Sequence, residues 1–390
     1  MVSKNNPETN VAGNAGLRAW LLAETLVALW DIKRPTCIYG APGGGKTSIV
    51  QQVAKKLGIS YVEIHLPTRN LEDFGVPFPN KETGTLPYFL PEWFPENGDR
   101  CRKEAKRLEE ENKRLEEDLD IGVEIAENKK RIKYLKEEAD KKDAWEGILC
   151  FDDRGQASRD LQCLLANIVH ARTLHEYSLP KGAMVVSTSN RQQDRAGANR
   201  ALSHLSNRET AYSLQTDVDD WMKWAFENDV KPEVIAFIKW MPGLLHKFDP
   251  QQDANPTPRS WVDGVSSVLG VVPRPAEFLS FVGAVGEGAA ASFKAFMDIY
   301  RDLPDIDDVI ANPTTVSVPD EPSKMYALSA ALAYRADKKN FDNIAKFINR
   351  IPGEFGVLLI KLSTMKNPEV CETKGYIQWA KDNMSITFGT

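Results

Sequence analysis

The first half of the chain alternates between two patterns of apolar and polar positions. Short runs rich in apolar, β-branched and aromatic residues are typical of buried strands. Segments with helical spacing of apolar residues lie between several of these runs. We therefore expect an α/β core. The expected strands cover residues 35–40, 59–66, 147–153, 183–189 and 210–214, and the expected helices cover residues 17–30, 46–57, 158–172 and 201–206.

The second half is mostly helical in pattern from Asp217 onward, with breaks at proline-rich stretches. Before the core, residues 1–16 are rich in Asn and Gly and offer little to bury, so we expect a flexible tail. The other expected divisions are an α/β core over 17–216, a helical domain over 217–272 and a helical C-terminal extension over 273–390.

Residues 99–143 differ from the rest of the chain because about two thirds of them are charged. Apolar residues still recur in each half of this block at alternating intervals of four and three, which is the seam of a coiled coil. The phase of the seam breaks near Gly122, so one uninterrupted helix does not fit. The first seam comprises Cys101, Ala105, Leu108, Asn112, Leu115 and Leu119, and the second comprises Ile121, Ile125, Asn128, Ile132, Leu135 and Ala139.

Folding the chain back at this break predicts an antiparallel helical hairpin inserted in the core. The two seams then face each other, and Asn112 lies opposite Asn128. A buried polar pair of this kind fixes the register of two helices at some cost in stability. A single long helix and a disordered segment remain as alternatives. The sequence does not indicate what such a hairpin contacts.

Composition narrows the class of protein. The chain has 390 residues, of which 42% are apolar and 27% charged, and its net charge is −6. An acidic balance disfavours general coating of nucleic acid, although local basic patches stay open. The apolar stretch at 17–30 is too short and too charged to span a membrane. The five cysteines are scattered without metal-site spacing, which indicates a cytoplasmic protein without disulfides or zinc.

A phosphate-binding pattern lies between the first expected strand and the next helix. GAPGGGKT at 40–47 fits G-x-x-x-x-G-K-[ST], in which glycines allow backbone N–H groups to approach a phosphate. Lys46 is expected to reach the β- and γ-phosphates, and the Thr47 hydroxyl to bind Mg²⁺. An accidental glycine-rich turn is the alternative. The residues expected to bind ATP here are Gly40, Pro42, Gly43, Gly44, Gly45, Lys46, Thr47 and Ser48.

Polar residues at the ends of two later strands complete the expected site. Asp152 directly follows an apolar run and is the expected second ligand to the metal, while Asp153 would orient or deprotonate the attacking water. Asn190 follows the fourth strand and would position that water if its strand lies between the first and the third. A surface strand end and a turn-forming Asn are the alternatives.

The order of these elements resembles that of AAA+ ATPases, and ILCFDD-RGQAS followed by VVSTSN resembles the MoxR-type branch. Segments such as PTPRSWVDGVSSVL are similar to those of its phage and prophage members. This resemblance implies five parallel strands in the order 5-1-4-3-2, and it makes residues 217–272 a helical lid. It also implies an Mg-dependent ATPase that works as a ring, expected to be a hexamer, and a partner protein with a von Willebrand A domain.

The same resemblance implies two arginine roles. Arg208, just before the fifth strand, matches the arginine finger that reaches the nucleotide of a neighbouring subunit, and Arg191, Arg195 and Arg200 compete for this role. Arg259 matches the second sensor arginine of AAA+ lids, and a surface arginine at a helix start is the alternative. Thr257 before it is the expected N-cap.

Two departures from the family pattern bear on activity. Asp153 stands where the family usually has Glu, so hydrolysis is expected to be slow. The charged block at 99–143 is an insertion. Three functions follow as hypotheses: a ring ATPase that remodels or assembles a protein target, a DNA-handling phage-type ATPase such as a loader or packaging accessory, and a nucleotide-switched scaffold with weak hydrolysis. Apolar residues 74–76 and 88–90 are candidates for a pore-facing loop or for core packing.

Overall fold

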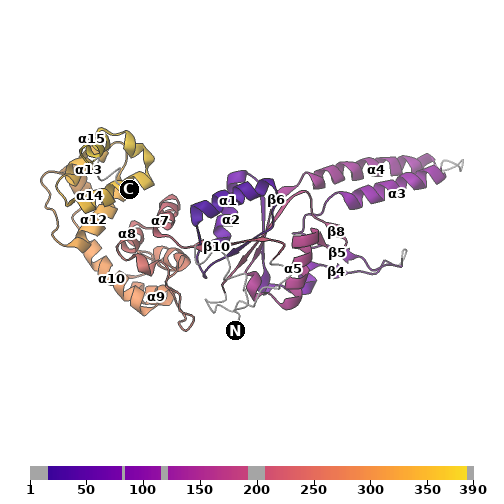
Figure 1. The fold of residues 1–390 in the computed structure, drawn as a ribbon, viewed down its shortest axis with the longest axis horizontal. Helices are drawn as coiled ribbons and strands as arrows, with labels where there is room; N and C mark the ends of the chain where they lie inside the picture. Colours follow the sequence, from indigo (N-terminus) through magenta and orange to yellow (C-terminus); the bar gives the residue numbers. More distant parts are fainter. Residues whose placement is uncertain (1–15, 81–83, 116–121, 192–206, 384–390) are drawn as a thin grey trace. The chain divides into compact units, whose positions relative to one another are not determined.

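The computed structural model describes residues 16–80, 84–115, 122–191 and 207–383. The chain divides into two compact units, one up to Gln215 and one from Thr216 (Figure 1). The helix expected at 201–206 and the tail at 1–15 lie outside the described residues.

The first unit is built on a parallel sheet of six strands in the order β1-β10-β2-β9-β6-β3. The sequence predicted five strands, and the additional one, β1, is a two-residue pairing at the edge beside β10, too short for a periodic pattern. Numbered along the chain without β1, the longer strands stand in the order 5-1-4-3-2. The strands are β1 (Leu17–Arg18), β2 (Thr36–Tyr39), β3 (Ser60–His65), β6 (Glu146–Asp152), β9 (Gly182–Ser189) and β10 (Thr210–Gln215).

Helices cover both faces of this sheet. α1 (Ala19–Asp31) and α2 (Lys46–Leu57) pack with Ile148 and Cys150 of β6 on one face. α5 (Arg159–Ala171) packs with Leu149 and Phe151 of β6 on the other face. Successive residues of a strand point to opposite faces, so a strand buried on both sides must be apolar throughout. This explains why the central strands appear as unbroken apolar runs in the sequence.

A second, two-stranded sheet follows β3. β4 (Val76–Pro77) pairs antiparallel with β5 (Tyr88–Phe89), while β7 (Thr173–Leu174) pairs with β8 (Tyr177–Ser178) elsewhere. Phe74 is fully buried and packs in the core, so its side chain is not available for a pore-facing role. Val76 and Phe89 are exposed.

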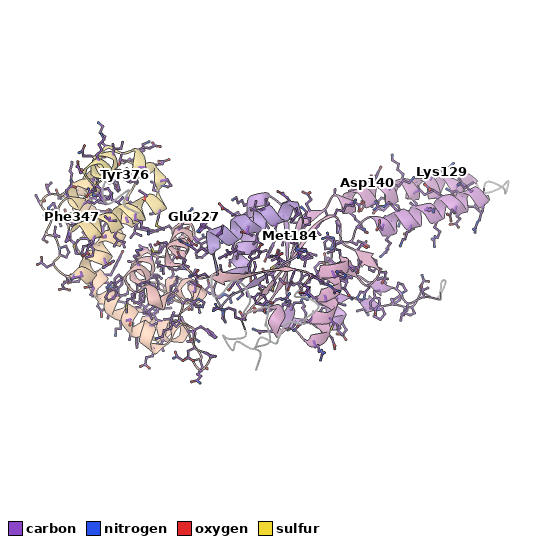
Figure 2. All side chains as sticks on the ribbon, viewed as in Figure 1. Lys129, Asp140, Met184, Glu227, Phe347 and Tyr376 are labelled. Carbon is purple, nitrogen blue, oxygen red and sulfur yellow. The ribbon has the colours of Figure 1, made fainter. Side chains whose placement is uncertain are left out.

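Two helices run side by side within the charged block, α3 (Asp99–Leu115) and α4 (Gly122–Asp143) (Figure 1). Their facing side chains make a small core of their own. Asn128 Nδ2 donates to Asn112 Oδ1 at 3.0 Å, so the two amides expected to face each other are in contact. Lys129 and Asp140 are exposed on α4 (Figure 2). The core members are Cys101, Ala105, Leu108, Ile132, Leu135 and Ala139.

The ends of the hairpin return to one place beside the core. The backbone N–H of Gly98 donates to Asp143 Oδ1 at 2.8 Å, Arg102 forms an ion pair with Asp143 at 2.7 Å, and Lys142 pairs with Glu96. An insertion with adjacent ends adds little constraint to the fold that carries it.

The second unit is helical. Its largest hydrophobic cluster runs from Trp221 to Trp379 and includes residues on both sides of the expected division at 272. Thr257 Oγ1 accepts from the Ser260 N–H at 3.1 Å, at the start of the π-helix η6 (Ser260–Ser266). Among the described residues, no helix is long and apolar enough to cross a membrane. The α-helices are α7 (Val218–Glu227), α8 (Pro232–Trp240), α9 (Arg274–Val285), α10 (Glu287–Arg301), α11 (Ile306–Ala311), α12 (Pro322–Arg335), α13 (Phe341–Ile348), α14 (Gly353–Lys366) and α15 (Lys374–Asp382).

Candidate functional site

The glycine-rich loop connects β2 to α2 and depends on backbone angles that favour glycine. Gly43 and Gly45 have φ angles of 69° and 87°, and Gly45 is the N-cap of α2. A tight turn forms where the Gly44 N–H donates to the Ala41 carbonyl at 3.2 Å. A loop of this kind before a helix N-terminus, where the helix dipole is positive, is suited to bind a phosphate group. Ser48 is exposed on the first turn of α2.

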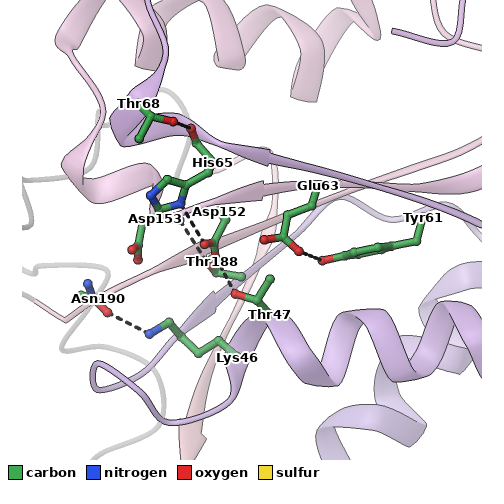
Figure 3. A network of polar contacts seen from close by, with 10 residues as sticks. All are labelled: Lys46, Thr47, Tyr61, Glu63, His65, Thr68, Asp152, Asp153, Thr188 and Asn190. Atoms are coloured by element: carbon green, nitrogen blue, oxygen red, sulfur yellow. Dashed lines mark hydrogen bonds and ion pairs between the residues drawn. The ribbon is translucent and has the colours of Figure 1, made fainter. Parts of the chain in front are cut away.

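Lys46 lies at the centre of the site and is buried. Its ammonium group donates to the carbonyl oxygens of Gly40 and Ala41, both at 3.1 Å. It also donates to Asn190 Oδ1 at 2.8 Å (Figure 3). These three acceptors are neutral oxygens that orient the ammonium group. The structure thus brings together Lys46 and Asn190, which are 144 residues apart in the sequence.

Asp152 accepts hydrogen bonds from three side chains (Figure 3). Thr47 Oγ1 donates at 2.5 Å and Thr188 Oγ1 at 2.6 Å, and His65 Nδ1 lies 3.2 Å from the other carboxylate oxygen. Burial alone would raise the pKa of Asp152, but the hydrogen bonds from Thr188, Thr47 and His65 outweigh burial and hold the pKa below its ordinary value. Asp152 is therefore a carboxylate at neutral pH.

Asp153 follows β6 in the left-handed conformation, with a φ angle of 51°. Its backbone N–H donates to Thr188 Oγ1 at 3.1 Å, so the Thr188 hydroxyl holds both acidic residues. Asp and Asn adopt this conformation more readily than most residues, because their short polar side chains suit it. The turn therefore explains in part why Asp stands at this position.

The donor set fits magnesium. The Thr47 hydroxyl and the Asp152 carboxylate are adjacent oxygen ligands of the kind that Mg²⁺ prefers. His65, Asp152 and Asp153 also have possible ligand atoms within 4.8 Å of one another. Imidazole nitrogen is a poor ligand for Mg²⁺. We therefore assign His65 to the orientation of Asp152, as an outer partner of the metal site.

An ion pair lies beside the site. Arg154 Nη1 donates to both oxygens of Glu209 at 2.6 and 2.7 Å, and both side chains are almost fully buried. Burial would lower the pKa of the Arg154 guanidinium, but Glu209 and its other neighbours raise it above the ordinary value.

The arginines expected to act as the finger or the second sensor differ in burial and in position along the chain. Arg208 is half-buried and immediately precedes Glu209, and Arg191 follows Asn190. Arg195 and Arg200 lie outside the described residues. Arg259 is exposed in the second unit and directly precedes η6, at its N-cap position. The contribution of Arg259 to the nucleotide site stays a prediction.

The sequence did not predict three contributors to the site, namely His65, Thr188 and the Arg154–Glu209 ion pair. His65 ends β3, Thr188 is the penultimate residue of β9, and the partners of Arg154 come from β2, β9 and the residue before β10. A polar residue at the end of a strand next to β6 was the available signal for His65 and Thr188. The Arg154–Glu209 pair had no signal, since its members are far apart in the chain.

One family of known proteins matches part of the first unit. Residues 36–203 match the AAA family, described as the ATPase family associated with various cellular activities. This range contains Lys46, Thr47, Asp152 and Asn190, so it carries the whole polar cluster. Residues 36–203 are therefore similar to the ATPase domain of this family. No curated protein matches the chain.

Several solved structures resemble the chain at low identity. The RuvB Holliday junction branch migration motor of Thermotoga maritima is 11% identical over 80% of this chain and 81% of that one, with a TM-score of 0.32. NtrX from Brucella abortus is 13% identical over 92% and 70%, with a TM-score of 0.36. A DNA replication initiation factor is 15% identical over 94% and 98%, with a TM-score of 0.31. Likenesses this weak indicate nothing about substrate or partner.

Proposed function

From the AAA-family domain and its polar cluster, we propose that this protein is an Mg-dependent ATPase of the MoxR type that works as a ring. The observation that carries the proposal is the convergence of Lys46, Thr47, Asp152 and Asn190 at the carboxyl ends of β9 and β6 and the start of α2. In open α/β sheets, ligands bind at this edge of the sheet.

Each residue of the cluster has a distinct task. Gly40, Pro42, Gly43, Gly44, Gly45 and Ser48 form or adjoin the loop that wraps the phosphates, and Lys46 supplies positive charge to them. Thr47 and Asp152 hold Mg²⁺, which neutralises charge on the phosphates when bound. Asp153 and Asn190 place the attacking water. The bond between Lys46 and Asn190 supports this assignment, because it fixes the amide beside the ammonium.

The site is completed by a second copy of the chain. Arg208 of the neighbouring subunit supplies the guanidinium that offsets charge as the phosphate leaves, and Arg259 of the same subunit contacts the nucleotide. This arrangement requires a ring, which we propose is hexameric and cytoplasmic. A partner with a von Willebrand A domain would couple hydrolysis to remodelling or assembly of a protein target.

Two variants test this proposal. Lys46→Ala removes the charge that the phosphates require, so binding of a fluorescent ATP analogue should be lost. Arg208→Ala should leave that binding unchanged but reduce turnover by about 10³-fold or more, the usual value of an arginine finger. Lys56→Ala, an exposed lysine on the same helix as Lys46, is the matched control and should behave as wild type. Retained ATP binding in Lys46→Ala would remove the nucleotide site from the loop, and retained turnover in Arg208→Ala would remove the finger assignment.

A further inference from the structure

The residue after Asp153 is anchored to three separate parts of the sheet. Arg154 begins a short 3₁₀ turn (Arg154–Gln156), and its side chain is fully buried. Its guanidinium donates to both oxygens of Glu209, to Tyr39 OH at 2.8 Å and to Ser187 Oγ at 3.3 Å. A planar guanidinium with donors in several directions is rigid when so many acceptors surround it. The turn that presents Asp153 is therefore fixed through its neighbour.

The other end of the ion pair is equally fixed. Glu209 stands between Arg208 and the first residue of β10, and its side chain is buried. The next residue, Thr210, is held by a hydrogen bond from its N–H to the Pro35 carbonyl at 2.9 Å and by one to its hydroxyl from Arg34 Nε at 3.1 Å. Arg208, the proposed arginine finger, is the residue directly before Glu209 in the chain, so holding Glu209 in place also restricts Arg208.

Stability is a weak explanation for this pair. Burying two charges costs roughly as much as their attraction returns, and apolar residues of similar volume are often as stable. The pair does, however, bridge the end of β6 and the start of β10, which lie three strands apart in the sheet order. Unlike an apolar contact, the Arg154–Glu209 ion pair fixes both the direction and the length of the contact between these two segments.

We propose that Arg154 and Glu209 are positioning residues that hold Asp153 and Arg208 of one subunit in a set geometry. The proposal rests on the proposed function, because it takes Asp153 to act on the subunit's own ATP and Arg208 on the ATP of its neighbour. The ion pair thus couples the two catalytic contributions of each subunit. A shift of the Asp152–Asp153 turn is passed to Arg208 through bonds of 2.6 and 2.7 Å.

The apolar double variant Arg154→Met with Glu209→Leu tests the coupling without leaving an unpaired charge. Its thermal unfolding and its affinity for a fluorescent ATP analogue should match those of wild type, while kcat falls about 100-fold with KM unchanged, as expected when catalytic groups are misplaced by about 1 Å. Wild-type kcat in the folded double variant would overturn the proposal. Arg154→Lys keeps the charge but loses the planar group that donates to Glu209, Ser187 and Tyr39 at once, so it should also lower kcat. If the double variant fails to fold, wild-type kcat in Arg154→Lys overturns the proposal instead.

Rings assembled from two different variants distinguish two possibilities. Either the ion pair positions both Asp153 and Arg208, or it positions only the turn that carries Asp153. Asp153→Asn subunits carry an intact Arg208, so mixing them with Arg208→Ala subunits should restore turnover. The double variant should restore far less turnover in the same mixture than Asp153→Asn, because its own finger is misplaced. Restoration equal to that by Asp153→Asn would show that the pair acts on the turn only, and would overturn the coupling. Wild-type turnover by Arg208→Ala alone would instead defeat the proposed function, independently of the ion pair.

Discussion

At the scale of single residues, the Thr188 hydroxyl joins both acidic residues of the site. It donates to Asp152 and accepts from the Asp153 backbone N–H. Thr188→Val keeps the shape but removes both bonds, so unfolding free energy at pH 7 should fall by about 1–3 kcal/mol. Thr188→Ser, which keeps a hydroxyl, is the control.

The loss of unfolding free energy caused by Thr188→Val should become smaller at acidic pH. The pKa of Asp152 is lowered in the folded chain, so the stability it contributes is present above the unfolded pKa of about 3.9 and is lost as pH falls through the folded value. The difference between wild type and Thr188→Val in urea denaturation should therefore shrink as pH falls below about 4. A difference that grows in acid would contradict the assigned cause.

Asp153 offers a clean test of the water-activating role. Asn has the same size and tolerates the left-handed conformation at φ 51°, so Asp153→Asn should keep fold and ATP affinity. Turnover should fall by about 10²–10⁴-fold, the usual contribution of a general base. Asp153→Ala should lose turnover similarly but also cost about 1 kcal/mol in stability through backbone strain. Turnover by Asp153→Asn near the wild-type rate would assign the water to another group.

How much of this site the sequence predicts depends on how far apart its residues lie along the chain. Lys46, Thr47 and Asp152 could be predicted because a fixed spacing and a strand end determine where they lie. The roles of His65 and Thr188 depend on which strands neighbour β6 and on their register, which no local pattern encodes. The partners of Arg154 are up to 115 residues away along the chain, and their pairing emerges only in the folded sheet.

At the scale of elements, the hairpin shows what periodicity can predict. Its seam gave the helices and the Asn112–Asn128 contact, because a heptad repeat specifies both the face and the partner. The two-residue strands β1, β4 and β5 were missed, because a pattern of period two needs more residues to be recognised.

The hairpin should also unfold independently of the core. Leu135 is buried among hairpin residues alone, so Leu135→Ala should lower the free energy of hairpin opening by about 2–5 kcal/mol. Hydrogen exchange should quicken in α3 and α4 and stay unchanged in β2, β6 and β9. Lys130→Ala, at an exposed position of α4, is the control. Faster exchange in the sheet as well would show that hairpin and core form one cooperative unit.

At the scale of the whole molecule, the proposed site cannot be completed by one chain, and this leads to a prediction about concentration. If Arg208 serves a neighbour, turnover per chain should fall as the protein is diluted below the point where the ring dissociates. ATP binding per chain should fall much less, because Lys46, Thr47 and Asp152 belong to one subunit. Mass photometry at each dilution would give the fraction assembled, and turnover should follow that fraction. A constant turnover per chain in a strictly monomeric sample would mean that no guanidinium is borrowed, and Arg191 of the same chain, which directly follows Asn190, would become the candidate to test by mutation.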